Sequence, residues 1–263
     1  MPITFGSLFT GVGGLDLGFE YAGMICKWQV EIAKQQLRLL RTKWPHVPKF
    51  TDIRNFADWP LSPVTVIGGG DPCPVRSKAK GSSKSSSPDL SGYFLAVVAR
   101  LRPRWVVREN VPASDHVHFD AALAALGYGT AIVRLDSAKI TGQSRQRDFF
   151  VGHYQATRSS LVNLFSHTHD GSGTITPNLK TTQVIPALVT GRTTHHPGDC
   201  YIYEAGRLRI LDGDEREAFA GFPPGWSAGF SETARALFYG NAIVPQAAQW
   251  IAQHIVKSEK ERI

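Results

Sequence analysis

The stretch ITFGSLFTGVGGLDLGFEYA, residues 3–22, decides the fold. Its first part, residues 3–9, is typical of a β-strand, a glycine-rich turn follows, and residues 15–22 are helix-like. Glycines in such a turn let the backbone approach a ligand closely, and the start of the helix offers unpaired N–H groups. A strand, a glycine turn and a helix in this order indicate a ligand site at the edge of an α/β sheet.

Strand-like and helix-like segments alternate through the first half of the chain. Further strands are expected at residues 25–30, 63–68, 105–107, 132–135 and 149–151, and helices at 92–101 and 121–126. Strands separated by helices predict an α/β fold with a mainly parallel sheet. The sequence from about residue 154 to 206 has weak periodicity, which predicts a small irregular insert. Amphipathic segments return at residues 209–222 and 234–256.

The composition excludes several classes of protein. Of 263 residues, 42% are hydrophobic and 19% are charged, which is typical of a folded globular chain. Apolar runs such as residues 64–67 fall far short of the roughly 20 residues that a membrane helix needs. No basic residue precedes Lys27, unlike a secretory signal. The net charge of +7 favours a polyanionic partner such as nucleic acid.

The chain has three cysteines, Cys26, Cys73 and Cys200, and none forms a C-x-x-C pair. We therefore expect a cytoplasmic protein with neither a disulfide framework nor a zinc site. The histidines His167, His169, His195 and His196 lack cysteine or acidic partners at ligand spacing, so we interpret them as surface residues.

Two acidic residues point to a cofactor that contains adenosine. Glu31 ends the next expected strand, 22 residues after Phe9, where an acid commonly binds the hydroxyl pair of a ribose. Asp52 follows a short possible third strand and could bind an exocyclic amine. The turn is not a G-x-G-x-x-G fingerprint, so a cofactor without pyrophosphate, such as S-adenosylmethionine, fits better. The alternative is that the glycine turn is only a tight connection.

Cys73 lies in the turn GGDPCP, residues 69–74, at the end of the strand expected at 63–68. Prolines on both sides stiffen the turn, and a basic loop over residues 75–88 follows. Positive charge favours the thiolate, so we predict a nucleophile. The alternatives are an inert buried cysteine and a solvated surface loop.

The next expected strand ends with Glu109 and Asn110, so a carboxylate would face the same crevice as Cys73. Further along, Gln143 is followed by Arg145 and Arg147. In an extended segment the two arginines point to one face, ready for phosphate or base contacts. The alternatives are an exposed strand-end acid and a solvated basic edge strand.

Six motifs in this order resemble the DNA (cytosine-5) methyltransferase family, in its small bacterial or phage type. They are F-x-G-x-G-G at residues 9–14, Pro72-Cys73 with Ser77, Glu109-Asn110-Val111, Q-x-R-x-R from Gln143, R-x5-E-x5-G-F-P from Arg209, and G-N-x-x-x-P from Gly240. The resemblance implies a Rossmann-like S-adenosylmethionine-dependent methyltransferase sheet with a small irregular target-recognition domain. It assigns residues 1–153 and 232–263 to a discontinuous catalytic and cofactor-binding domain and residues 154–231 to target recognition.

The same resemblance implies the chemistry: methyl transfer from S-adenosylmethionine to C5 of cytosine in double-stranded DNA, after base flipping. Cys73 would add to C6, Glu109 would hold N3 and the exocyclic amine, and Arg145 would support the base from its O2 side. The implied cofactor residues are Phe9, Gly11, Gly13, Gly14, Glu31, Ile32, Asp52, Ile53, Leu90 and Asn241. The implied DNA-contacting residues are Pro72, Arg76, Ser77, Lys78, Asn110, Gln143, Arg147, Lys180, Thr181 and Arg192. The resemblance also implies a monomer in the bacterial cytoplasm, associated with the nucleoid, with no metal and no membrane contact.

The chain departs from the common family pattern at Ser7, Ala33, Asp71, Pro74 and Arg108. Ser7 stands where an aspartate is usual, and apolar residues are usual or frequent at positions 71 and 108. An acid at Asp71, near Cys73, would disfavour the thiolate. Only 57 residues, 152–208, are left to read the target, which predicts a short site of about two to four base pairs.

Competing functions remain. The tRNA-methylating branch of the family carries a Cys-Phe-Thr tripeptide, which is absent here. Separate RNA cytosine methyltransferases use a second cysteine where this chain has Glu109. A catalytically silent DNA-binding protein would be expected to lack Cys73 or Glu109. Roles as a restriction partner, in phage self-protection or in regulation stay open.

Overall fold

The computed structural model describes residues 2–72, 89–112, 116–165, 174–175, 188 and 201–261. Several residues singled out above lie outside this part of the chain: Cys73, Pro74, Arg76, Ser77, Lys78, His167, His169, Lys180, Thr181, Arg192, His195, His196 and Cys200. Within the described part, no helix is both long enough and apolar enough to cross a membrane.

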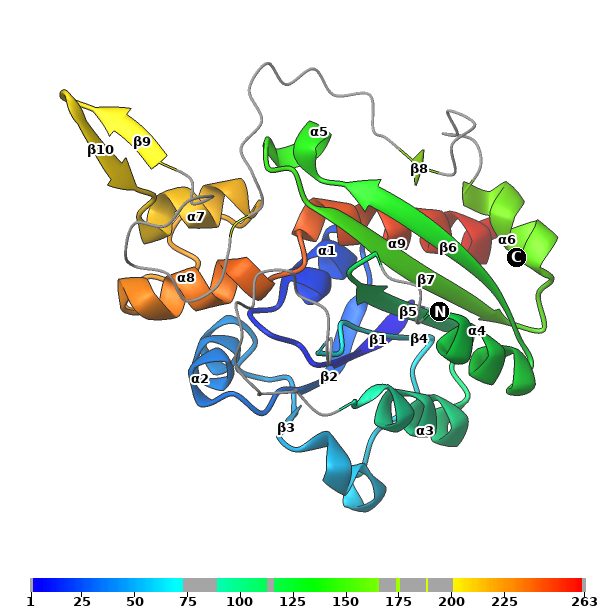
Figure 1. Cartoon of the computed structure of the whole chain (residues 1–263). Helices are drawn as coiled ribbons and strands as arrows, with labels where there is room; N and C mark the ends of the chain where they lie inside the picture. The colour runs from blue at the N-terminus through cyan, green and yellow to red at the C-terminus, as the bar shows by residue number, and fades with distance from the viewer. Residues whose placement is uncertain are drawn as a thin grey trace.

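The core of the molecule is an eight-stranded sheet with strand order β3-β2-β1-β4-β5-β7-β6-β8 (Figure 1). The strands are β1 Thr4–Leu8, β2 Ile25–Val30, β3 Lys49–Phe50, β4 Val66–Gly69, β5 Trp105–Asn110, β6 Tyr128–Asp136, β7 Gln146–Tyr154 and β8 Thr174–Ile175. Only β7 runs antiparallel to its neighbours, so the expected mainly parallel α/β sheet is confirmed.

The bounds of several strands differ from the prediction, and β6 and β7 are longer at both ends. β4 begins at Val66 rather than at Pro63. β5 extends through Arg108, Glu109 and Asn110, because these polar residues pair with β7 in the interior of the sheet. The strand that carries the predicted carboxylate is therefore central, and Glu109 itself pairs with Phe149 of β7, which holds that carboxylate in a defined place.

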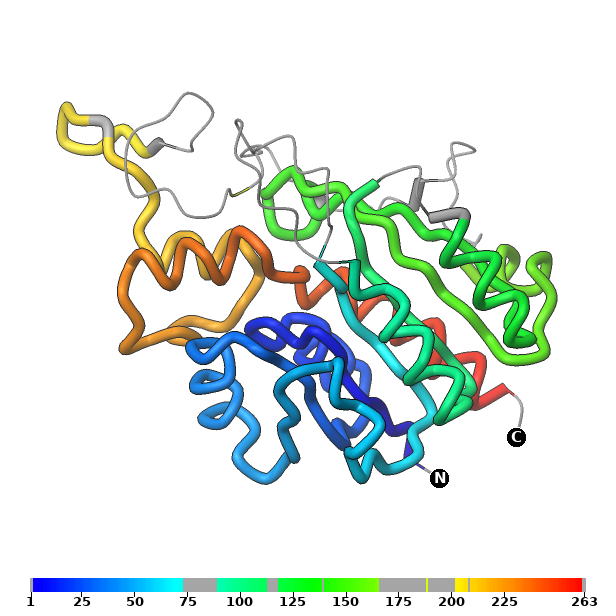
Figure 2. Tube along the Cα trace, turned by 60° about the horizontal axis from the view of Figure 1, so that its bottom comes forward, coloured from blue at the N-terminus to red at the C-terminus, as the bar shows by residue number. Residues whose placement is uncertain are grey.

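Helices cover both faces of the sheet. The helical elements are α1 Gly14–Tyr21, α2 Lys34–Lys43, η1 Ile53–Asp58, α3 Ser91–Leu101, α4 His116–Ala125, α5 Ala138–Thr141, α6 Arg158–Phe165, α7 Gly213–Phe219, α8 Glu232–Asn241 and α9 Pro245–Glu261. Helices α1, α6 and α9 pack on one face, and α3 and α4 pack on the other (Figure 2). Alternation along β5 follows from this: Trp105 and Val107 face α9, whereas Val106 faces α3.

The last helix, α9, packs along α1, so segments from the two ends of the described chain lie side by side (Figure 1). A Cβ at Gly18 of α1 would come within 2.2 Å of the carbonyl oxygen of Pro245, so glycine permits the close approach. The amphipathic segment expected at 234–256 is two helices, α8 and α9. Pro245 is the first residue of α9, a position that proline tolerates because its missing N–H has no helical partner there.

Helix α2, helix α6 and the hairpin of β9 and β10 were not predicted from the sequence. Helix α2 buries only Leu37, Leu39 and Leu40, so its apolar pattern is short. Within the segment expected to be irregular, α6 buries Leu161 and Phe165 in the main core, and strands β9 Tyr201–Glu204 and β10 Arg207–Ile210 form a separate hairpin. A third apolar cluster joins α2, α7 and α8 beside the sheet.

Candidate active site

The glycine turn after β1 has a backbone that favours glycine. Phe9, Gly11 and Gly13 have positive φ angles of 53°, 60° and 83°. A Cβ at Gly13 would come within 2.5 Å of the Trp44 ring, and one at Gly14 within 1.9 Å of the Ile243 carbonyl oxygen. The turn therefore packs tightly on one side, and the segment before α9 lies against it.

Glu31 is attached to this turn. Its Oε2 accepts a 2.7 Å hydrogen bond from the Gly11 N–H, and its Oε1 accepts one of 2.7 Å from the Ala33 N–H. Burial raises the pKa of Glu31, and the two donors oppose that shift. Each carboxylate oxygen retains a second lone pair, so the group can still accept hydrogen bonds from a ligand.

Four further predicted cofactor residues, Ile32, Asp52, Ile53 and Leu90, do not line the hollow described below. Asp52 caps η1 and accepts from the Arg54 N–H at 3.1 Å and from its Nε at 2.8 Å, and this partner lowers the pKa of Asp52. Ile53 is buried, while Ile32 is 61% exposed. Leu90 precedes α3, and both Leu90 and Phe9 pack against the apolar cluster on the α3 side of the sheet.

A hollow of about 410 Å³, open to solvent, brings the separate motifs together. Of the predicted residues, Phe9, Gly11, Gly14, Glu109 and Asn241 line it. The prediction missed its other lining residues, which are Thr10, Val12, Gln36, Gly70, Leu237, Phe238, Ala242 and Ile243. Most of these residues lie within or beside one of the motifs, and that proximity could have identified them. Gln36 of α2 lies in no motif, so nothing in the sequence indicated it.

Glu109 is 7% exposed, so it is not a solvated strand-end acid. It lines both this hollow and a second one of about 230 Å³ on the side of the arginine motif. The Nε of Arg147 lies 2.9 Å from its Oε1. Burial raises the pKa of Glu109, and the charges of Arg147 and Arg145 act in the opposite direction. A Cβ at position 70 would come within 2.9 Å of Oε2, so Gly70 leaves room for the carboxylate.

Arg145 is also buried, at 6% exposure, and its Nη1 donates a 3.1 Å hydrogen bond to the Gly240 carbonyl oxygen. Burial, and secondarily the charge of Arg147, lowers the pKa of Arg145, but the ordinary value is so high that the guanidinium keeps its charge near pH 7. Since β7 lies between β5 and β6, the alternative of a basic edge strand is wrong.

Two residues predicted to contact DNA, Gln143 and Asn110, are buried. The Gln143 side chain is fully buried, and its amide oxygen and nitrogen have no hydrogen-bond partner among the described residues. Asn110 is 7% exposed, and its Oδ1 accepts from the Val111 N–H at 2.8 Å. Pro72 is exposed at the end of the described segment.

A buried polar network stands behind the glycine turn at Ser7, where the family usually has an aspartate. The Ser7 hydroxyl donates to Oδ2 of Asp16 at 2.8 Å, and the Gln29 amide donates to Oδ1 at 2.8 Å. Asp16 is fully buried, and burial raises its pKa to about 6. The carboxylate of this network is therefore supplied by Asp16 of α1.

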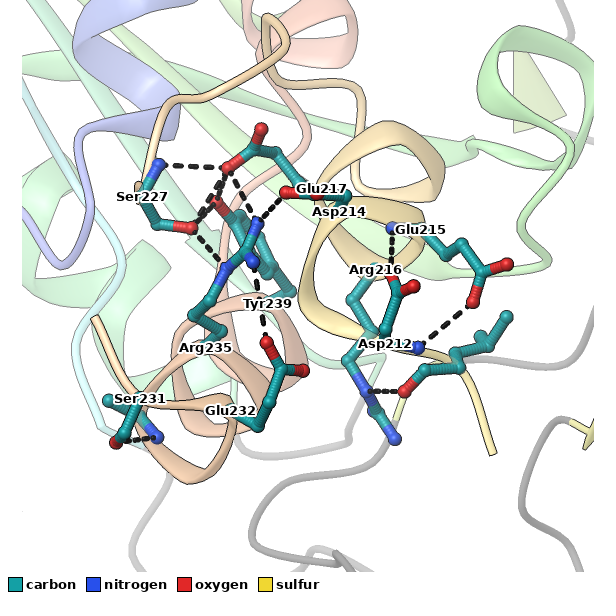
Figure 3. A network of polar contacts seen from close by, with 12 residues as sticks. Asp212, Asp214, Glu215, Arg216, Glu217, Ser227, Ser231, Glu232, Arg235 and Tyr239 are labelled. Carbon is teal, nitrogen blue, oxygen red and sulfur yellow. Dashed lines mark hydrogen bonds and ion pairs between the residues drawn. The ribbon is translucent and has the colours of Figure 1, made fainter. Parts of the chain in front are cut away.

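Residues of the motif that begins at Arg209 support the glycine turn through α7 and the loop after it. Arg209 donates two hydrogen bonds to Glu215, of 2.7 and 2.8 Å, and Glu215 also completes the cap of α7. Figure 3 shows how α7 and α8 are joined: Glu217 accepts from the N–H and hydroxyl of Ser227, both at 2.8 Å, and from the hydroxyl of Tyr239 at 2.6 Å. This network anchors the loop whose Trp226 indole donates to the Val12 carbonyl oxygen at 3.0 Å.

The described residues contain no group of three or more His, Cys, Asp or Glu side chains arranged to hold a metal ion.

Comparisons with known proteins agree with this geometry. Residues 3–201 match the model of the C-5 cytosine-specific DNA methylase family. The type II methyltransferase M.HindV of Haemophilus influenzae is 25% identical over 296 residues, covering 97% of both chains. The type II methyltransferase M.NgoMIV of Neisseria gonorrhoeae is 26% identical over 316 residues, covering 99% of both.

Solved structures of similar fold include DNMT2 of Spodoptera frugiperda, with a TM-score of 0.69 at 13% identity, covering 97% of this chain and 99% of that one. A putative DNA modification methyltransferase encoded within a prophage of E. coli has a TM-score of 0.69 at 16% identity, covering 98% and 99%. The sheet order and these likenesses define a Rossmann-like methyltransferase fold. The chain belongs to the C-5 cytosine-specific DNA methylase family and is a DNA cytosine-5 methyltransferase, which confirms the resemblance drawn from its six motifs.

Proposed function

We propose that this enzyme transfers a methyl group from S-adenosylmethionine to C5 of a cytosine flipped out of double-stranded DNA, through a covalent adduct of Cys73. One observation carries the proposal. The hollow lined by the glycine turn and Asn241 also contains the buried Glu109, so a cofactor site and a base site would adjoin.

The hollow suits S-adenosylmethionine. Its turn has no side chain at Gly11, where a Cβ would meet little but open space, and Glu31 presents acceptor oxygens beside it. When bound, the cofactor supplies an electrophilic methyl group. Residues that would hold it are Phe9, Gly11, Gly13, Gly14, Glu31, Ile32, Asp52, Ile53, Leu90 and Asn241.

The residues of the chain would activate the base. The Cys73 thiolate forms a bond to C6, which moves electron density toward C5 and N3. A protonated Glu109 donates to N3, and its raised pKa favours that form. Arg145, held by Gly240, lies beside Glu109 and would contact O2 of the base. After methylation of C5, loss of the C5 proton breaks the C6–S bond and restores Cys73. A stacked base cannot be reached in this way, so the cytosine must leave the helix.

Target reading would fall to residues 154–231, with residues 1–153 and 232–263 as the catalytic domain. The basic segment with Arg76 and Lys78, and Lys180, Thr181 and Arg192, would contact DNA. We propose a monomer acting in the bacterial cytoplasm on nucleoid DNA. The names of its type II relatives favour a role in restriction–modification.

The test is expression in cells that lack cytosine methylation, followed by bisulfite sequencing of the recovered DNA. We expect 5-methylcytosine within a defined motif of about two to four base pairs. A parallel culture with Cys73→Ser should lose the signal. Soluble enzyme without methylated DNA would contradict the proposed substrate, equal methylation by Cys73→Ser would contradict the covalent step, and a fixed six-base-pair site would contradict the short target.

A further inference from the structure

Two of the departures from the family pattern are partners in one buried ion pair. The Nε and Nη2 of Arg108 donate to the two carboxylate oxygens of Asp71, the second bond measuring 2.7 Å. The side chains are 8% and 1% exposed. Such a two-pronged contact fixes distance and orientation together, because the guanidinium and the carboxylate are both planar.

The pair connects the two strands that carry the catalytic motifs. Asp71 follows β4 and stands two residues before Cys73, while Arg108 lies on β5 directly before Glu109. The strands pair in parallel, with Gly69 opposite Arg108. The ion pair therefore reaches past the last paired residue of β4 and attaches the start of the nucleophile turn to β5.

The pair does not enter the site itself. Because side chains alternate along a strand, Arg108 and Glu109 point to opposite faces of the sheet. The Arg108 guanidinium lies 4.2 Å from the ring centroid of Phe119 in α4 and 5.9 Å from that of Phe150 in β7. Glu109 instead lines the two hollows. Arg108 and its partner Asp71 thus lie on the opposite face of the sheet ends from the two hollows, and neither residue lines them.

We infer that Asp71 and Arg108 are positioning residues: their ion pair attaches the chain two residues before Cys73 to the strand that carries Glu109, and Arg108 neutralises the charge of Asp71. The inference rests on the proposed function of Cys73. Stability alone does not account for the pair, since a buried ion pair is commonly no more stabilising than apolar packing.

The charge part is tested without DNA or cofactor, by the pH dependence of iodoacetamide alkylation at Cys73, followed by peptide mass spectrometry. Arg108→Met removes the positive partner of Asp71 and leaves it only the Asn110 amide, so the midpoint of Cys73 alkylation should rise by about one pH unit or more. Arg108→Lys keeps a positive charge and should retain the parent midpoint. Asp71→Leu/Arg108→Leu removes both charges and should also retain it.

The geometric part is tested with a duplex containing 5-fluorocytosine at the target site. The reaction contains S-adenosylmethionine, and after methylation C5 carries fluorine in place of the proton that would be lost, so the C6–S bond persists and the adduct can be counted. Arg108→Lys loses the paired hydrogen bonds to the two Asp71 oxygens and so holds Asp71 less rigidly. The rate of adduct formation should therefore fall about tenfold, with the KM for DNA nearly unchanged. The control is Arg104→Met, which removes the ion pair to Glu259 at the other end of β5 and should leave both readouts at parent values.

The outcomes are separable. If the parent enzyme forms no adduct and methylates no DNA, the proposed function fails, while the alkylation midpoints still report on the pair. If the parent is active and folded Arg108→Met and Arg108→Lys match it in midpoint and adduct rate, the inference is overturned. Should Arg108→Met not fold, the lysine and double leucine variants decide: parent-like adduct rates in both overturn it.

Discussion

The guanidinium of Arg145 donates a 3.1 Å hydrogen bond to the main-chain carbonyl oxygen of Gly240, joining two motifs 95 residues apart. The carbonyl is in the last turn of α8, one residue before Asn241 of the first hollow. Arg145 itself lines the second hollow with Glu109. One contact therefore connects the linings of the two hollows, which we propose to be the cofactor side and the base side of the site.

Arg145→Lys should reduce kcat for DNA methylation by about 10- to 100-fold, because a lysine keeps the charge but loses the planar contact with Gly240 and the base. Single-turnover methylation of a target duplex measures this. The matched control is Arg102→Lys, since Arg102 also donates one 3.1 Å bond to a main-chain carbonyl oxygen, that of Leu126, away from both hollows. A parent-like rate in Arg145→Lys would exclude the assigned role.

Glu109→Gln should slow methylation by about 100- to 1,000-fold, because a neutral amide cannot hand a proton to N3 as charge develops there. The pH profile gives a second readout. Burial raises the pKa of Glu109, so the protonated form persists to higher pH and activity falls as pH rises through that pKa. This falling limb should be absent from the residual activity of Glu109→Gln, and its persistence would assign the limb to another group.

Asp16→Asn should change the pH dependence of stability. Burial raises the pKa of Asp16 from 3.8 to about 6, so the folded state binds this proton more tightly than the unfolded state. The parent therefore loses stability as pH rises from about 4 to above 6, by up to about 3 kcal/mol at 1.4 kcal/mol per pKa unit. Urea unfolding at pH 4.5 and 7.5 should show a smaller loss in the variant. Asn in place of the exposed Asp58 is the control, and an unchanged slope in Asp16→Asn would contradict the prediction.

Gly18→Ala should destabilise the protein by about 1–3 kcal/mol, because the added methyl group would meet the Pro245 carbonyl oxygen at 2.2 Å and force α9 away from α1. The control is Gly92→Ala in α3, where a Cβ has nothing within 4 Å. Thermal unfolding of both variants measures the difference. Equal melting temperatures of the two variants would contradict the predicted loss of stability in Gly18→Ala.

Much of the fold followed from local pattern. The strand, glycine turn and helix at residues 3–22 were found nearly as predicted, because each depends on neighbouring residues and their periodicity. The burial of the end of β5 inside the sheet was not predictable in this way. Arg108, Glu109 and Asn110 are polar, and only pairing with β7, forty residues later, makes them part of a central strand.

The sequence by itself determined the chemistry available to this protein: a cysteine in a proline-flanked turn, a carboxylate after a strand, two arginines in series and a glycine turn, in an order that marked the family. The tertiary structure alone decided which of these groups meet. Asp71 with Arg108, Arg145 with Gly240 and Trp226 with Val12 are contacts across 37, 95 and 214 residues. No local periodicity encodes such pairs, because they arise only when packing of the sheet and helices brings distant backbone segments to hydrogen-bonding distance.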